Sequence, residues 1–462
     1  MKKILYSAGH SRMARKWGMV GEVAKRLMED PENEVFYLDC NGNVKGPCGL
    51  NHKKHWGYCR NCQIPCLKVL KHAGLPDDHI LKMQKYKSPK FPEFKSVREA
   101  IDYDYDGYDL GLGPVSCIMT ITRDYDFDIK KWNKHIHRFF ETEYTILKNI
   151  EYFDNIYHFD EIHTFNGRMA SMYPYVSYAR KHNKEFCVYE GGAKLERILI
   201  LKNSVPHDYK TRINYIPELW NNGSDDKEEL AVKWFSERRA GKQQLTSFTK
   251  EQIRGSLPKG FDCSKENYVY FNSSSDEFAA FPGWELPFGE TENNIIKNLL
   301  EHYKDDTNKH FYLRIHPNLK RAKKKKTTQM REIEELKKNY KNLTVIEPEE
   351  KIDSYALMEA ANKIISTLST IGCESTFWGK ISISVGKSEY DNLNCVHKAR
   401  SMEELYKLID DKELEPKPKE STYPYGYFAE TFGELFKYTK VNSYTDCEFL
   451  GMKLVSKKSI YK

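Results

Sequence analysis

Polar residues follow three apolar segments in the second half of the chain, at the points where predicted strands end. They are Asn272, Ser273 and Ser274 after residues 267–271, His316 and Pro317 after residues 310–315, and Ser369 and Thr370 after residues 363–367. Ligands of open parallel sheets bind beyond the carboxyl ends of the strands, so we expect these side chains to converge. Imidazole and hydroxyl groups, together with the free amides of a predicted helix start, are typical of a phosphate site.

Three further residues belong to the same turns. Arg314 stands two residues before His316, Gly372 permits close approach of a ligand, and Glu374 lies in the predicted helix that runs through Trp378. A single His-Pro pair is usually structural, and Ser-Thr before a helix is usually an N-cap. Because these motifs follow strands of one domain in order, we predict that they act together on a phosphate-bearing ligand.

Strand-like and helix-like segments alternate along the chain in two successive sets. The predicted strands are residues 4–7, 34–38, 108–112, 163–165 and 185–189 in the first set, and 267–271, 310–315, 343–346 and 363–367 in the second. Longer amphipathic segments separate most of them, which indicates βαβ units and parallel sheets. We therefore predict an α/β fold of two Rossmann-like domains facing a cleft, at residues 1–255 and 256–420. A helical tail at residues 421–462 is expected to pack across both and to cross back to the first.

Length and composition agree with two globular domains. The 462 residues fit two domains of roughly 200 residues. With 40% hydrophobic residues, 31 Tyr and 23 Phe, the chain has enough apolar surface to build two cores. No apolar run reaches the roughly 18 residues that a membrane span needs, so we expect a cytoplasmic protein.

Charge narrows the range of partners. Much of the net charge of +7 lies in the basic run at residues 320–326. A solvated loop explains such a run, and so does peripheral contact with an acidic membrane surface or a polyanionic acceptor. Nucleic acid is not expected, because no zinc-finger spacing of His pairs and no aromatic-basic strand pattern is present. A nicotinamide cofactor is disfavoured, because no Gly-x-Gly-x-x-Gly follows the first strand.

The motifs of the second half resemble those of a known family. Phe271-Asn272-Ser273-Ser274, Arg314-Ile315-His316-Pro317 and Ser369-Thr370-Ile371-Gly372-Cys373-Glu374 together are similar to the capsule polysaccharide biosynthesis glycosyltransferases. These enzymes share short His-Pro and Ser-Ser or Ser-Thr motifs with bacterial sialyltransferases and Kdo transferases. The resemblance covers residues 268–386 best. It implies a GT-B fold and a nucleotide-sugar donor bound by the second domain, with a CMP-sugar favoured and UDP- or GDP-sugars as alternatives.

In the first half the resemblance implies an acceptor site and a catalytic base. Glu190 stands where the sialyltransferase-like families carry the base in an acidic-acidic-Gly motif, although Tyr189 replaces the first acidic residue. A loop glutamate that caps the next helix is the structural alternative. Asp124, His163 and Glu277 are the next candidates for the base. The acceptor is expected to contact Ser7, Gly9, His10, Asn166 and Arg168.

A cysteine cluster stands apart from these motifs. Cys48, Cys59, Cys62 and Cys66 lie within nineteen residues, with Cys40, His52 and His55 nearby. Cys59-x-x-Cys62 is a common zinc-knuckle spacing, so a structural zinc site is one interpretation and buried or regulatory thiols are the other.

The expected function is metal-independent, inverting transfer of a sugar to a glycan or lipid-linked acceptor of surface polysaccharide synthesis. The alternatives are a nucleotide-sugar epimerase, a polyol-phosphate transferase and a non-catalytic glycan-binding protein.

Overall fold

The computed structural model describes residues 1–8, 12–49, 51–242, 250–274, 276, 278–286, 288 and 291–457, with the side chains of residues 321, 323 and 325 also outside the described part. The chain forms two compact units. Unit 1 comprises Met1–Ile121, Asp126–His207 and Phe432–Lys462, and unit 2 comprises Thr122–Tyr125 and Asp208–Thr431. The division at His207 lies earlier in the chain than the predicted boundary at residue 255.

Unit 1 is built on a seven-stranded sheet in the order β15-β8-β7-β6-β1-β2-β3. Strands β1, β2, β3, β6 and β7 are parallel, and at one edge β8 pairs antiparallel with β7 and β15 pairs antiparallel with β8. Its strands are β1 (Lys2–Ser7), β2 (Asn33–Asp39), β3 (Ile80–Lys82), β6 (Glu161–Phe165), β7 (Glu185–Gly191), β8 (Arg197–Lys202) and β15 (Glu434–Leu435). The helices are α1 (Ala14–Leu27), α2 (Trp56–His72), α3 (Val97–Ile101), α4 (Leu112–Thr122), α5 (Ile129–Tyr157) and α6 (Tyr173–Lys181).

The alternation of side chains along β2 assigns the two faces of this sheet. Val35 and Tyr37 join the core cluster that contains residues of α1 and α2. Phe36 points to the other face, where its ring packs against Tyr157 at the end of α5 and against Phe159. Helices therefore cover both faces, as in a doubly wound sheet.

The end of the chain completes unit 1 with strands rather than with the predicted helix. Helix α15 (Tyr423–Thr431) ends just before Gly433, whose φ of +83° does not fit a helix. Strand β15 follows, and then the three-stranded sheet of β16 (Thr439–Ser443), β17 (Asp446–Phe449) and β18 (Met452–Val455), which packs on α1. The chain thus returns to unit 1 as predicted, but α15 itself belongs to unit 2.

Unit 2 contains a six-stranded parallel sheet in the order β11-β10-β9-β12-β13-β14. These strands are β9 (Glu266–Phe271), β10 (Lys309–Arg314), β11 (Leu343–Ile346), β12 (Lys363–Ser366), β13 (Ile381–Ser384) and β14 (His397–Lys398). The helices are α7 (Tyr209–Asn221), α8 (Lys227–Arg239), α9 (Glu292–His302), α10 (Lys320–Lys325), α11 (Thr328–Asn339), α12 (Ser354–Ala360), α13 (Ile371–Phe377), α14 (Met402–Asp410) and α15.

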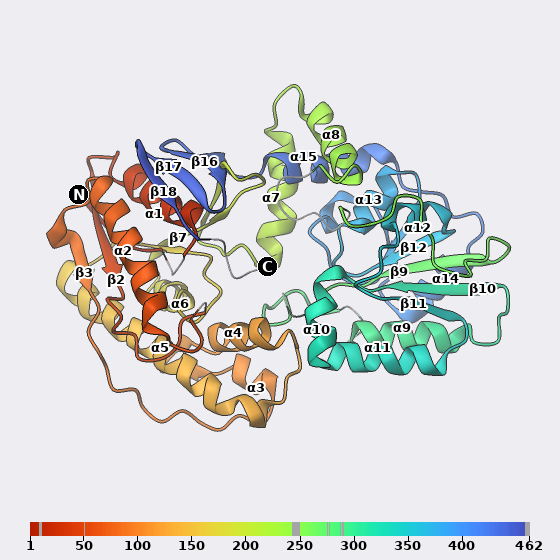
Figure 1. Ribbon diagram of the computed structural model, residues 1–462, viewed down its shortest axis with the longest axis horizontal. Coiled ribbons are helices and arrows are strands. Elements are labelled where there is room, and N and C mark those ends of the chain that lie inside the picture. Colours follow the sequence, from red (N-terminus) through yellow and green to blue (C-terminus); the bar gives the residue numbers. More distant parts are fainter. Residues whose placement is uncertain are drawn as a thin grey trace. The chain divides into compact units, whose positions relative to one another are not determined.

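This strand order creates a switch point between β9 and β12. The chain adds β10 and β11 on one side of β9 and then β12, β13 and β14 on the other, which is the order of a Rossmann fold. Figure 1 shows α9 and α11 on one face of the sheet and α12 and α13 on the other. Two core clusters on β9, one with Tyr268 and Tyr270 and one with Val269 and Phe271, correspond to these faces. The predicted fold class of two Rossmann-like α/β domains is confirmed.

Two local predictions were wrong for identifiable reasons. Residues 108–112 do not form a core strand, because Asp106 and Gly107 adopt positive φ and turn the chain into a hairpin of β4 (Asp104–Tyr105) and β5 (Tyr108–Asp109). The basic run at residues 320–326 is not a loop, because its first six residues form α10, in which Ala322 is buried.

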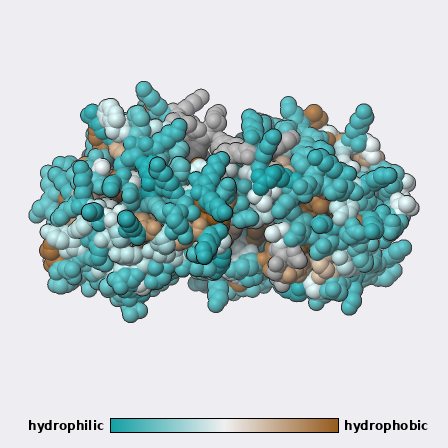
Figure 2. Space-filling view, turned by 90° about the horizontal axis from the view of Figure 1, so that it is seen from below, coloured by the Kyte–Doolittle hydropathy of each residue, from teal (hydrophilic) through white to brown (hydrophobic). Residues whose placement is uncertain are grey.

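The described surface is mostly polar. Hydrophilic residues dominate the face drawn in Figure 2, with hydrophobic residues scattered among them. Among the helices of the described residues, none combines the length and the apolar character that a bilayer crossing requires.

Candidate functional site

A pocket lies at the switch point of unit 2, beyond the carboxyl ends of β9, β10 and β12. It encloses about 630 Å³ between its walls, open mouth included. Four elements outside the sheet, α8, α12, α13 and the segment before β9, supply the rest of the wall. The lining residues are Arg238, Gln252, Phe271, Asn272, Arg314, His316, Pro317, Ser354, Tyr355, Ser369, Thr370, Ile371 and Glu374.

His316 is fixed on both sides by its neighbours. Its backbone amide donates to Oδ1 of Asn272 (2.7 Å), and the amide of Asn318 donates to its Nδ1 (3.2 Å). Burial lowers the pKa of His316 to about 4, helped by the positive charges of Arg238, Arg314 and Arg123. The ring is therefore neutral near pH 7, and because Nδ1 accepts a hydrogen bond, its proton resides on Nε2 as a donor.

Arg238 brings a guanidinium into the wall from α8. It donates to Oε1 of Glu374 (2.7 Å) and to Oγ1 of Thr370 (3.0 Å). Burial opposes its charge, but Glu374 and Tyr355 raise the pKa of Arg238 above its usual value. Glu374, predicted to contact nucleotide, thus acts on Arg238 and also accepts hydrogen bonds from Thr370 and Tyr355.

Asn272 and Arg314 carry buried donors in the same wall. Asn272 is 1% exposed, and its Nδ2 has no hydrogen-bond partner among the described residues. Arg314 is held by the carbonyls of Glu347 (2.7 Å) and Glu350 (3.1 Å), and its buried Nε is likewise unsatisfied in the described part of the chain. Burial without a partner costs about 1–3 kcal/mol per group, so such donors are suited to a ligand acceptor.

Three predicted residues of this site have other partners in the structure. Ser273 donates from its amide (3.1 Å) to buried Glu292, and Ser274 donates from its hydroxyl (2.7 Å) to buried Asp276. At Gly372 an added Cβ would lie 2.3 Å from the Tyr390 hydroxyl and 2.6 Å from the Ser366 hydroxyl. This glycine therefore permits close packing of Tyr390, which the sequence alone does not distinguish from close approach of a ligand.

In unit 1, Glu190 and Asn166 lie together at the ends of β7 and β6. Asn166 adopts φ +59° directly after β6, and its Nδ2 donates to Oε2 of Glu190 (2.5 Å). Burial lowers the pKa of Arg15 and of Lys16, and the charge of Glu190 opposes this shift at both. The carboxylate thus lies in a positively charged environment.

The other predicted acceptor residues are dispersed. Nη2 of Arg168 donates to Thr120 (3.0 Å). The hydroxyl of Ser7 donates to the carbonyl of Leu38 (3.3 Å), and Ser7 lines a pocket whose lining does not include Glu190. Gly9 and His10 lie outside the described residues.

Two alternative bases occupy structural positions, and the third, Glu277, lies outside the described residues. Asp124 accepts hydrogen bonds from the amide (3.0 Å) and the hydroxyl (3.3 Å) of Thr328 at the start of α11. His163 is 3% exposed, contacts the Tyr189 hydroxyl through Nδ1, and places Nε2 3.0 Å from Glu161.

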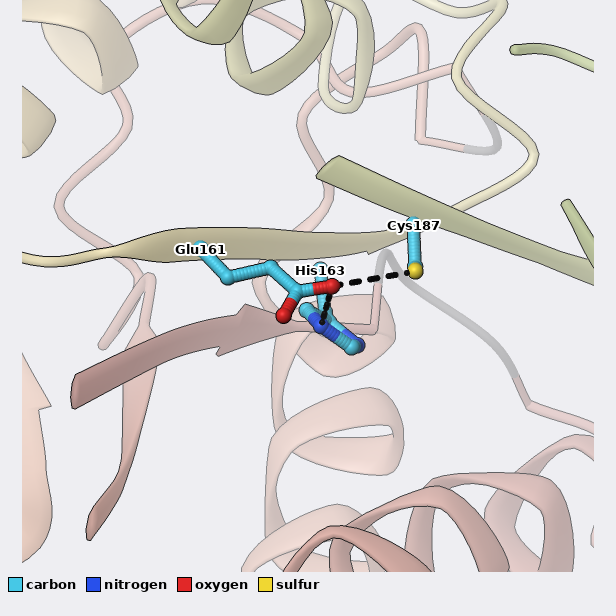
Figure 3. Close-up of side chains that lie close together, drawn as sticks. All are labelled: Glu161, His163 and Cys187. Carbon is cyan, nitrogen blue, oxygen red and sulfur yellow. Dashed lines mark hydrogen bonds and ion pairs between the residues drawn. The ribbon is translucent and has the colours of Figure 1, made fainter. Parts of the chain in front are cut away.

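Glu161, His163 and Cys187 form the buried group drawn in Figure 3, the one set in the described residues with three possible metal-ligand atoms within 4.8 Å of one another. Cys187 donates to Glu161 (3.2 Å), and Lys2 pairs with the same carboxylate. The hydrogen bond from His163 contributes most to lowering the pKa of Glu161, and Lys2 adds to it. Because Lys2 already neutralises the carboxylate, we interpret this group as an internal ion-pair network.

The four cysteines of the predicted zinc site line one pocket of unit 1 together with Cys40. No three of their sulfur atoms lie within 4.8 Å of one another. Cys40, which the sequence places near the four, joins them in this lining from the end of β2.

Arg238 of unit 2 was not predicted, because it follows no strand and no local motif marks it.

Comparisons with known proteins find distant likenesses only. No protein-family model and no curated protein matches the sequence. Among solved structures, the chain is similar to the KpsC β-Kdo 2,4-transferase of Thermosulfurimonas dismutans, with 13% identity, a TM-score of 0.38, and coverage of 58% of this chain and 79% of that one. It is also similar to the UDP-GlcNAc 2-epimerase of Methanocaldococcus jannaschii in complex with UDP-GlcNAc and UDP, with 12% identity, a TM-score of 0.30, and coverage of 91% and 97%.

Proposed function

We propose that the protein transfers a sugar from a nucleotide-sugar donor to a glycan or lipid-linked acceptor of surface polysaccharide synthesis. The observation that carries this proposal is the unit 2 pocket, in which His316, Asn272 and Arg238 gather at the switch point of a Rossmann sheet. Ligands of such sheets bind at this position. A CMP-sugar is the favoured donor because of the His-Pro and Ser-Thr pair, with UDP- and GDP-sugars as alternatives.

The donor phosphate is assigned to the wall that these three residues form. Nε2 of neutral His316 and the buried Nδ2 of Asn272 are hydrogen-bond donors, which complement phosphate oxygens. Arg238 and Arg314 supply two positive charges in the lining against the one carboxylate of Glu374. A departing nucleotide gains negative charge as the glycosidic bond breaks, and donors held in place in advance stabilise that charge.

Glu190 is assigned the role of base toward the acceptor hydroxyl. Its Oε2 is oriented by Asn166 and its Oε1 by the amide of Gly191 (2.9 Å). A positioned base contributes about 10²- to 10⁴-fold to such a proton transfer. Removal of the proton allows the hydroxyl oxygen to attack the anomeric carbon as the nucleotide phosphate leaves, which inverts the configuration. No residue of this scheme requires a metal ion.

The first experiment is thermal unfolding of the purified protein with CMP, CDP, UDP, GDP and NAD. Selective stabilisation by a sugar-carrying nucleotide is expected, with a size that follows the ligand concentration relative to Kd. A variant with Asn272→Ala should lose this stabilisation, whereas Ser273→Ala should keep it, because the Ser273 hydroxyl donates to Glu292 (3.4 Å) and does not line the pocket. Stabilisation by NAD alone, or by none of the five, would refute the assignment of the donor site.

Product analysis then separates transfer from epimerisation. A transferase consumes the nucleotide sugar in proportion to glycosylated acceptor, whereas an epimerase converts the sugar without an acceptor. Conversion of the nucleotide sugar without acceptor would establish the epimerase alternative. Tight nucleotide binding with no turnover under either condition would establish the non-catalytic one.

A further inference from the structure

Five of the eleven cysteines line one pocket of unit 1, next to the carboxyl end of β2. Cys40 follows β2 directly, Cys48 lies in the next loop, and Cys59, Cys62 and Cys66 lie on α2. We propose that Cys40, Cys48, Cys59 and Cys62 form a tetrathiolate site for a thiophilic metal centre, with Cys66 excluded from it. This ligand set differs from the one that spacing alone predicts, because Cys40 replaces Cys66.

Position relative to the pocket and to the apolar core defines the set. Cys40, Cys48, Cys59 and Cys62 line the pocket but are not members of the apolar core cluster of unit 1, although Cys62 is only 9% exposed. The four thiols thus share the pocket as their common surroundings.

Cys66 lines the same pocket but also packs into the apolar core. It belongs to the core cluster that contains Tyr6, Tyr37 and Val69. A thiol in such surroundings behaves as a small hydrophobic side chain. The helical spacing of Cys62 and Cys66 therefore misleads, because the two thiols share one side of α2 but not one environment.

A side-chain amide also points at one of the four sulfurs. Nδ2 of Asn51 lies 3.4 Å from Sγ of Cys59, and its Oδ1 accepts from the amide of His55 (2.8 Å). Buried structural thiols have no need of such donors, whereas metal-bound thiolates are oriented and tuned by them.

Metal binding would change the protonation state of these thiols. A bound cation converts the thiols to thiolates and releases their protons. It would tie together β2, the loop at residues 41–55 and the start of α2, which is the role of a structural site.

Zinc and an iron–sulfur cluster share this thiolate chemistry but differ in size. Tetrahedral zinc with bonds of about 2.3 Å requires sulfurs roughly 3.8 Å apart. No three of these sulfurs have all their distances within 4.8 Å, so zinc binding would draw them together, whereas a cluster spans a wider set of thiolates. Either centre is a member of the proposed class, and the experiment distinguishes them.

The test is the metal and acid-labile sulfide content of the full chain, purified without oxygen and without chelators. We expect about one zinc per chain, or iron with matching sulfide and visible absorption. Cys40→Ser, Cys48→Ser, Cys59→Ser and Cys62→Ser should each lose the metal, whereas Cys66→Ser and the exposed Cys263→Ser should retain it. Metal-free protein, or loss of metal in Cys66→Ser with retention in Cys40→Ser, would overturn the proposal.

Wild-type protein provides a second readout where a serine variant fails to fold. After exchange into cobalt(II), a tetrathiolate site gives intense sulfur-to-cobalt charge-transfer and tetrahedral d–d absorption. Absence of these bands in cobalt-loaded protein, or bands typical of oxygen and nitrogen ligands, would also overturn it. Nucleotide binding is not expected to change either result, because the proposed donor site belongs to unit 2.

Discussion

His316 is the residue whose replacement tests the proposed donor site most directly. Replacement by alanine removes a buried donor, so nucleotide affinity should fall by about 1–3 kcal/mol, or roughly 5- to 150-fold. Calorimetric titration of His316→Ala with the preferred nucleotide measures this. His310→Ala on the same strand is the matched control, because His310 bonds Thr344 at the other end of β10 (2.8 Å). Unaltered affinity in His316→Ala would remove the residue from the phosphate site.

The same histidine predicts a pH dependence of stability. Its pKa is lowered to about 4 in the folded protein, against about 6.5 in an unfolded chain. The unfolded state therefore binds the extra proton first, and the stability that neutral His316 contributes above about pH 6.5 is lost as pH falls toward 4. Unfolding by urea across this window should show a smaller loss in His316→Gln than in wild type. An equal loss in both proteins would show that the imidazole is solvated rather than buried.

The proposed role of Glu190 as the base can be tested by a replacement that keeps the size and shape of its side chain. Glu190→Gln should lower turnover by about 10²-fold or more while nucleotide affinity stays near wild type, because an amide cannot accept the proton. Steady-state kinetics with saturating donor, together with nucleotide titration, separate the two effects. Glu185→Gln, on the exposed start of β7, is the control. Full turnover in Glu190→Gln would leave the glutamate with the structural role of holding Asn166.

Among the residues that line the unit 2 pocket, those that directly follow a strand could be predicted from the sequence, and those that do not could not. His316, Thr370 and Asn272 were found because parallel strands direct their carboxyl ends to one edge. Ser273 has the same sequence context as Asn272, yet it bonds Glu292, because only the three-dimensional position of that carboxylate decides the partner. Arg238 comes from a helix in another part of the sequence, where no pattern announces a pocket.

At the scale of elements, α1 and the terminal three-stranded sheet depend on glycines and a buried glutamate. Glu22 is 0% exposed and accepts hydrogen bonds from the amides of Lys437 (2.6 Å) and Tyr438 (2.9 Å). An added Cβ at Gly21 would lie 2.4 Å from Val69 and 2.7 Å from the Phe449 ring. The glycine thus allows α2 and the tail to approach α1 closely.

Gly21→Ala is therefore expected to destabilise the protein, even though alanine favours a helix. Forcing a methyl group into a filled space costs about 1–3 kcal/mol, more than the roughly 1 kcal/mol that helix propensity returns. Chemical denaturation measures the difference. Gly57→Ala in α2 is the control, because the nearest atoms to its added Cβ are those of the His55 side chain at 3.3 Å. A net gain in stability from Gly21→Ala would contradict the close packing of these elements.

The elements that were predicted and those that were not differ in the length of the sequence pattern that indicates them. Helix α5 is one of the longer amphipathic segments that were expected between the strands, because its apolar period extends over 29 residues. The hairpin at Asp106-Gly107 was not predicted, although an Asp-Gly dipeptide is typical of a hairpin turn. The tail was predicted as a helix from its aromatic pattern, and Gly433 is the residue that ends that pattern.

At the scale of the molecule, Phe449→Ala tests whether the two units unfold independently of each other. Its ring is fully buried in the unit 1 core, so Phe449→Ala should cost about 3–5 kcal/mol there. Scanning calorimetry should show one transition shifted downward and the nucleotide-dependent transition of unit 2 retained. Leu435→Ala, at an exposed position of the same tail, is the control. Equal shifts of all transitions would show that the units unfold as one.

The α/β architecture of both units could be predicted from the sequence. The points at which the chain passes from one unit to the other could not. Periodicity identifies strands and helices within a sheet, and this was enough for two Rossmann-like domains. It gives no information about which sheet a distant strand joins, so β15 at the edge of β8 was not foreseen. The position of the division at His207 depends on such long-range pairing.

Apart from residues 122–125, unit 2 is a single stretch inserted between two parts of unit 1. The ribosome therefore releases residues 208–431 before the strands that cover α1 have been made. Until then Gly18, Gly21 and Glu22 have no tail to pack against, and the part of α1 that the tail covers stays exposed on the nascent chain. We expect unit 2 to finish folding first during synthesis although it begins later, and unit 1 to be the part that chaperones protect.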